Sequence, residues 1–202
     1  MTRLSNRLLL LPALLLAAAG CEDDTSFVRA YQMETMAQAI GGPAAAARPG
    51  DYMLENNRLR AVIHGRHNQR STFPIANGSL VDLDIQRPSG KSRLGRGKDA
   101  FYEFGPMVNL KINSSRTMAF GACDTVGEAP CPKPACQRVT ASGPAENVMS
   151  LLALLDLAIL RESFDNAKMW MTTDYDLCPD EPFVRITTSA KFEEKPGKTV
   201  DM

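Results

Sequence analysis

The sequence lacks the short motifs that mark several common classes of enzyme. G-x-S-x-G, which holds the serine nucleophile of α/β-hydrolases on a sharp turn, does not occur. H-E-x-x-H, the helical motif of zinc proteases, is also absent. Gly90-Lys91-Ser92 has the form of a P-loop ending, but Ile85 stands where the first glycine of G-x-x-x-x-G-K-S is required. These absences exclude nucleotide binding at this loop, and we expect no cofactor.

The sequence also lacks an excess of either charge. Lysine and arginine number 23, as do aspartate and glutamate. Removing residues 1–20 takes away Arg3 and Arg7, so the remainder carries 21 basic against 23 acidic residues, a net charge of −2. Such a chain has no global field that would attract nucleic acid, and we expect no nucleic-acid partner.

No apolar run is long enough to cross a membrane as a helix, which takes about 20 residues. The stretch from Leu8 to Gly20 follows two basic residues and ends in small residues. A basic start, a short apolar core and a small-residue end are typical of a secretory signal peptide. We therefore predict an exported protein with a signal peptide over 1–20.

The signal peptide ends in Ala18-Ala19-Gly20-Cys21, which resembles the lipobox of bacterial lipoproteins. In that family the signal is cut just before the cysteine, which is lipidated, so the resemblance implies a membrane anchor at Cys21. Glu22 is related to the inner-membrane retention signal of some Gram-negative lipoproteins, but that signal is aspartate, and we expect the outer membrane. The alternative is an ordinary signal peptide that is cut elsewhere.

The four other cysteines are Cys123, Cys131, Cys136 and Cys178. An even remainder in an oxidising compartment indicates two disulfides, whose pairing the sequence leaves open among three possibilities. Cys178 follows a predicted strand, so we expect a bridge from that strand to the proline-rich loop over 127–136. A zinc site is the alternative, but no C-x-x-C pair occurs.

The composition and patterning predict a mainly β chain with one packed helix, arranged as an antiparallel sheet or β-sandwich. Residues 21–50 are expected to form the lipidated cysteine and a tether, with a short helix over 27–40, and residues 51–202 the β-rich domain. Asn56-Asn57 indicates the turn of a hairpin over 51–65, and alternation predicts strands over 81–85, 169–177 and 184–192, each with one buried and one wet face.

The helix is expected over 146–162, where leucines, Val148 and Ile159 follow helical spacing. We expect Leu152 and Leu155 to lie in the core. The last residues, "KTVDM", read as the start of a strand without a partner, so we expect the domain to be incomplete at its carboxyl end.

A pattern that recurs in other proteins is matched by three pieces of the sequence, "GDYMLENNRLRAVIHG", "NGSLVDLDI" and "TTDYDLCPDEPFVRITTS". It resembles the first domain of large lipoproteins of Gram-negative soil bacteria, where a G-D-Y-x-L-x-N phrase leads into a sandwich related to that of galactose mutarotase. The resemblance implies a β-rich envelope module and carries over no catalytic residue.

Candidate binding and catalytic residues are few. His64 and His67 could bind a metal only with a carboxylate, so we predict no metal site. Asp82, Asp84, Asp174 and Asp176 lie on the polar side of alternating strands and are expected to face water. Two basic groups could bind acidic polysaccharide or lipid headgroups: Arg58, Arg60, Arg66 and Arg70, and then Lys91, Arg93, Arg96 and Lys98.

Three functions remain open. The first is a lipid-anchored, non-enzymatic β-domain that binds an envelope polysaccharide or protein, or spaces other domains from the membrane. The second is a fragment of a carbohydrate-active enzyme. The third is an adhesion or assembly lipoprotein whose basic face binds envelope polymers.

Overall fold

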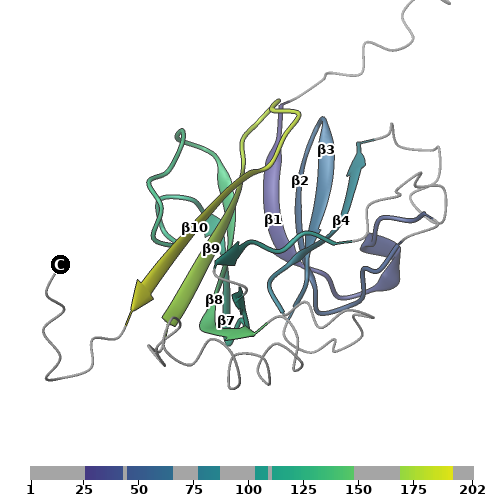
Figure 1. The fold of residues 1–202 in the computed structure, drawn as a ribbon. Coiled ribbons are helices and arrows are strands. Elements are labelled where there is room, and N and C mark those ends of the chain that lie inside the picture. The colour runs from purple at the N-terminus through teal and green to yellow at the C-terminus, as the bar shows by residue number, and fades with distance from the viewer. Residues whose placement is uncertain are drawn as a thin grey trace, which may run out of the picture.

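The fold is mainly β and antiparallel. The computed structural model describes residues 26–42, 45–65, 77–86, 103–108, 111–147 and 169–192 (Figure 1). Within these ranges the chain forms two antiparallel sheets that face each other, and the only helical segment is a short 3-10 turn, η1 (Met36–Gln38). The prediction of a mainly β, antiparallel fold is confirmed.

The first sheet has four strands in sequence order, each antiparallel to the next. The strands are β1 (Val28–Gln32), β2 (Tyr52–Asn56), β3 (Leu59–Ile63) and β4 (Leu80–Ile85). The predicted hairpin is present as β2 and β3. Its two linking residues are Asn57 and Arg58, one position later than we expected.

The second sheet is built around the long strand β8. Its strands are β5 (Met107–Val108), β6 (Lys111–Asn113), β7 (Thr117–Ala122), β8 (Gln137–Asn147), β9 (Met169–Leu177) and β10 (Arg185–Phe192). β8 pairs with β9 on one side, and with β7 and β6 in succession on the other. The predicted pairing of the last two strands is confirmed as β9 with β10.

The main core lies between the two sheets. Apolar side chains of β2, β3 and the start of β4 meet inward-facing side chains of β8 and β9. The buried members are Leu54, Leu59, Ala61, Ile63, Leu80, Val139, Tyr175 and Leu177. The Tyr175 hydroxyl donates a hydrogen bond to the Gly78 carbonyl at 2.7 Å, which fixes the turn before β4 to the opposite sheet. Burial raises the pKa of Tyr175, so the phenol stays a donor.

A second apolar cluster covers the outer face of the first sheet. Met53, Val62 and Val81 point to this face. They pack against side chains of the entry segment, the chain between β1 and β2, which are Met33, Ala39, Ile40 and Ala47. The hairpin is therefore buried on both faces, and the expectation of one wet face is wrong here. The stretch 27–40 forms β1 and η1 in place of the expected short helix, because β1 is hydrogen bonded along β2.

The helix expected over 146–162 does not begin at Glu146, because strand β8 continues to Asn147. Glu146 and Asn147 are the last residues of β8 and pair with Ile112 and Lys111 of β6. The ladder with β6 takes the backbone hydrogen bonds that a helix would need. Residues 148–162, with Leu152 and Leu155, lie outside the described residues, as does the terminal "KTVDM".

Asn56 explains why the hairpin turn is fixed to the rest of the fold. Its side-chain oxygen accepts hydrogen bonds from the backbone of Arg58 and Leu59, and its amide donates to the carbonyls of Cys178 and Glu181. One fully buried side chain thus holds the β2–β3 turn against the β9–β10 turn.

Truncation of the inter-sheet core at Leu54 should destabilise the domain strongly. Leu54 is fully buried between the sheets, so Leu54→Ala is expected to lower the free energy of unfolding by about 2–5 kcal/mol. Urea unfolding measures the change. Ile85→Ala, at a side chain that is 63% exposed, is the control and should change stability by no more than about 0.5 kcal/mol. Equal effects of the two changes would contradict the assigned core.

Candidate functional site

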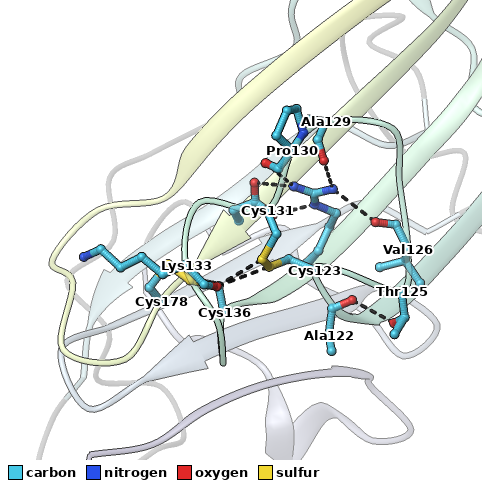
Figure 2. Close-up of a disulfide and its surroundings, with 12 residues drawn as sticks. Ala122, Cys123, Thr125, Val126, Ala129, Pro130, Cys131, Lys133, Cys136 and Cys178 are labelled. Carbon is cyan, nitrogen blue, oxygen red and sulfur yellow. Dashed lines mark hydrogen bonds and ion pairs between the residues drawn. A yellow bond between two sulfur atoms is a disulfide. The ribbon is translucent and has the colours of Figure 1, made fainter.

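The four cysteines downstream of Cys21 pair as Cys123 with Cys131 and Cys136 with Cys178. Both pairs gather at one place in the fold, where the loop between β7 and β8 meets the end of β9 (Figure 2). The prediction that a bridge joins this strand to the proline-rich loop is confirmed by Cys136–Cys178. Pairing uses all four thiols, so none of them is left to ligate zinc.

A buried arginine organises the loop that these disulfides close. Arg138 of β8 has no exposed surface. Its guanidinium donates to both carboxylate oxygens of Asp176, at 2.6 and 2.8 Å. Its remaining N–H groups donate to the carbonyls of Val126, Ala129 and Pro130. Figure 2 shows these three carbonyls turned toward a single guanidinium group. Arg138 therefore fixes the loop over the outer face of the second sheet.

Asp174 completes this network from the next outward position of β9. Its carboxylate accepts from the Thr140 hydroxyl at 2.6 Å and from the backbone N–H groups of Glu128 and Ala129. The loop can approach so closely because position 127 is glycine. A Cβ at Gly127, whose φ is +82°, would lie 2.3 Å from an oxygen of Asp174. The arrangement binds the protein's own loop.

The expectation that the four strand aspartates face water is wrong for three of them. Asp82, Asp174 and Asp176 are at most 2% exposed, and Asp84 is partly buried. Alternation correctly placed Asp174 and Asp176 on the side opposite Tyr175. That side is covered by the loop between β7 and β8. The side of β4 that carries Asp82 lies under the entry segment.

Two members of the predicted basic groups, Arg58 and Arg60, lie within the described residues. Arg58 is exposed at the β2–β3 turn, whereas Arg60 is buried and its Nε lies 2.7 Å from Glu55. Arg29 donates to the same carboxylate. Burial by itself would raise the pKa of Glu55, but the guanidinium groups of Arg60 and Arg29 outweigh it and hold that pKa below its usual value. Arg60 is thus engaged inside the protein.

The remaining members of the basic groups, Arg66, Arg70, Lys91, Arg93, Arg96 and Lys98, lie outside the described residues, as do His67 and Cys21. His64 is buried at the end of β3. Across the ranges that the structure describes, no three side chains of the metal-ligating types come together.

Several residues that shape the site were not singled out from the sequence. Arg138 and Asn56 form buried polar contacts with partners far along the chain, and Glu55 forms one with Arg60, five positions later. The available signal for Arg138 was weak: an arginine in a strand of mixed polar and apolar residues, two positions after Cys136. Its partners become visible only once the loop is folded over β8 and β9.

The start of β1 lies at one end of the sandwich, beside two turns (Figure 1). The Ser26 hydroxyl donates to Asp180 at 2.5 Å, and Asn57 donates to the same carboxylate. These two hydrogen bonds lower the pKa of Asp180. The chain therefore enters the fold beside the β2–β3 and β9–β10 turns.

Comparisons with protein-family models, with curated proteins and with solved structures find no match to this chain. No helix in the described ranges has the length and apolar character to cross a membrane. The function therefore rests on the geometry and on the sequence.

Removal of the buried guanidinium should be among the most damaging single changes. Arg138→Met leaves two carboxylates buried without their cation, and we expect a loss of about 3–5 kcal/mol in the free energy of unfolding. Arg185→Met, on the neighbouring strand opposite Asp176 but exposed, is the matched control. The double change Arg138→Met with Asp176→Leu should recover part of the loss. If it is additive instead, the two side chains are not coupled.

The two disulfides should differ in their effect because they close loops of different length. Cys136–Cys178 spans 42 positions and Cys123–Cys131 spans 8. Replacing each pair by alanine is expected to cost about 4 and about 2.5 kcal/mol respectively, from the loss of constraint on the unfolded chain. Urea unfolding gives both values, and thiol titration of the unreduced exported protein in guanidinium should find no reactive thiol. A larger loss from the short loop would contradict this order.

Proposed function

We propose that the chain is an exported lipoprotein, held in the cell envelope through Cys21, whose sandwich is a non-enzymatic binding or spacer module. The observation that carries the proposal is the direction of the chain through the fold. The chain enters β1 at the end where Ser26 bonds Asp180. β10 starts at that same end and finishes at Phe192 at the other end (Figure 1).

Chain length supports this orientation. Cys21 and Ser26 are five positions apart, and an extended chain covers at most about 3.6 Å per position, or about 18 Å in all. The entry end would thus lie close to the membrane. β10 has eight residues, which at about 3.3 Å per residue place Phe192 about 23 Å from the start of the strand. The fold would carry the following chain away from the lipid surface.

The paired cysteines support an exported location, since disulfides persist in oxidising compartments. The antiparallel sandwich fits a relation to the amino-terminal region of large Gram-negative lipoproteins, and the outer membrane remains the proposed destination. In that resemblance the G-D-Y-x-L-x-N phrase is structural. Here Asp51 accepts a hydrogen bond from the Gly65 backbone, and Asn56 holds two turns together.

The enzymatic alternative gains little from these residues. Asp174 and Asp176 are engaged by Arg138 and by loop amides, so neither is placed to act on a substrate. The adhesion alternative requires exposed cations. Of the two members of the basic groups that the structure describes, Arg58 is exposed and Arg60 is buried. A partner such as an envelope polysaccharide or another envelope protein remains part of the proposal.

Lipidation of Cys21 is the direct test. Cells that express the full chain are given radiolabelled palmitate, and the label should enter the wild type but not Cys21→Ala. Ser26→Ala, beyond the cleavage junction, is the control and should keep the label. Equal labelling of wild type and Cys21→Ala would remove the proposal of an anchor at this residue.

A further inference from the structure

The loop between β7 and β8 covers only part of the outer face of the second sheet. It lies over Asp174, whose carboxylate accepts from two of its N–H groups, and its Glu128 side chain lies beside Ser189 and Lys191 of β10. Trp170 is on the same face as Asp174, because the two are four positions apart along β9, and it is 39% exposed. The uncovered part of this face therefore presents the only tryptophan of the sequence.

A row of hydroxyl side chains crosses four strands next to Trp170. Residues directly opposite each other in antiparallel strands lie on the same face, and the register places one hydroxyl on each of β7, β8, β9 and β10. At about 4.8 Å between strands, the row is about 14 Å long. Its members are Thr117, Ser142, Thr172 and Ser189. Thr172 is buried and the other three reach the surface, where each hydroxyl can both donate and accept a hydrogen bond.

The neighbouring outward row is apolar at its centre. Trp170 lies between its two cross-strand partners, Pro144 of β8 and Lys191 of β10. Pro144 is partly exposed and adds a second ring beside the indole. Successive outward residues of a strand are about 6.8 Å apart, so the rings and the hydroxyls are within reach of one short ligand. We call these two rows, together with Glu128, the Trp170 face.

The charges of the Trp170 face do not favour an acidic ligand. Lys191 is the only cation in the two rows, and its Nζ lies 2.7 Å from a carboxylate oxygen of Glu128. Glu146, two positions beyond Pro144, is an exposed acid. An acidic polysaccharide or a lipid phosphate would therefore find no unpaired cation in these rows and would be repelled by Glu146. An uncharged ligand avoids both penalties.

Uncharged sugars have the complementary chemistry. In a pyranose with equatorial substituents, the two faces of the ring present C–H groups, and the hydroxyls point outward from its edge. The C–H faces match the indole and proline rings, and the hydroxyls match side chains that both donate and accept. Binding sites commonly combine such apolar surfaces with a few polar groups that fix orientation.

We propose that the Trp170 face binds an uncharged glycan of β-linked, equatorially substituted pyranoses. One sugar ring stacks on the indole, and its hydroxyls bond Ser142, Ser189 and the pair formed by Lys191 and Glu128. This inference rests on the proposed function as a binding module. It adds the class of ligand and the surface that holds it.

The test uses the full chain, purified from membranes of expressing cells in a detergent without a sugar headgroup, with cellohexaose and chitohexaose as probes. Because Trp170 is the only tryptophan, its fluorescence reports on this face directly. We expect saturable binding of at least one probe, with emission shifted to shorter wavelength and protection of the indole from acrylamide quenching. No change with either probe would overturn the proposal.

Trp170→Ala should weaken the binding by about tenfold or more, measured by calorimetry, as is typical of an aromatic side chain at the centre of a site. Phe192→Ala is the matched control and should bind as the wild type does. Phe192 is 59% exposed and follows Lys191 in β10, so its ring lies on the opposite face of the sheet. Urea unfolding checks that each variant is folded, and the wild-type fluorescence decides the question if Trp170→Ala is not.

Equal losses from the two changes would overturn the proposal, as would tighter binding of polygalacturonate, an acidic polymer, than of both probes. Palmitate labelling of the same preparation separates the two proposals. A labelled protein that binds neither probe overturns the glycan site alone. A protein that binds through Trp170 but carries no label at Cys21 overturns the anchor alone.

Discussion

The second sheet and the loop above it depend on the buried ion pair between Arg138 and Asp176. A guanidinium without solvent contact is tolerable only when each N–H group has an acceptor. Asp176 supplies two acceptor atoms and the loop carbonyls supply the rest. The same bonds that satisfy the cation therefore fix the path of the loop. The Asp174 carboxylate also accepts hydrogen bonds from two backbone N–H groups of the loop. The stability of the second sheet and the conformation of the loop therefore depend on the same hydrogen bonds.

Such a network gives specificity at a cost in desolvation. Hydrophobic residues could bury the same surface between loop and sheet, but they would supply no hydrogen-bond donors to the loop carbonyls. The disulfides act on the same segment by limiting its unfolded states. Loop conformation is thus determined twice, once by covalent pairing and once by directional hydrogen bonds at Arg138.

The local pattern of polar and apolar residues made much of the fold predictable. The rest depends on contacts between segments far apart in the sequence, which the local pattern does not show. Alternation identified β9 and β10: Tyr175 of β9 lies in the core, and Ile186 of β10 packs against it. The same alternation assigned Asp174 to solvent, since nothing local shows that a loop some 45 positions earlier lies over it. At Glu146, helical spacing of the following leucines suggested a helix where pairing with β6 extends the strand. The number of cysteines predicted two disulfides, and the position of Cys178 predicted a bridge to the proline-rich loop, but the sequence did not show which cysteine of the loop is its partner.

The opposite positions of Ser26 and Phe192 have a mechanical consequence. A pull between these two points runs along the strands and not across them. Hydrogen bonds between β1 and β2, and between β10 and β9, would then be loaded in shear, several at once, and would not open one after another. Tension on the chain beyond β10 would meet resistance along the whole length of each outer strand.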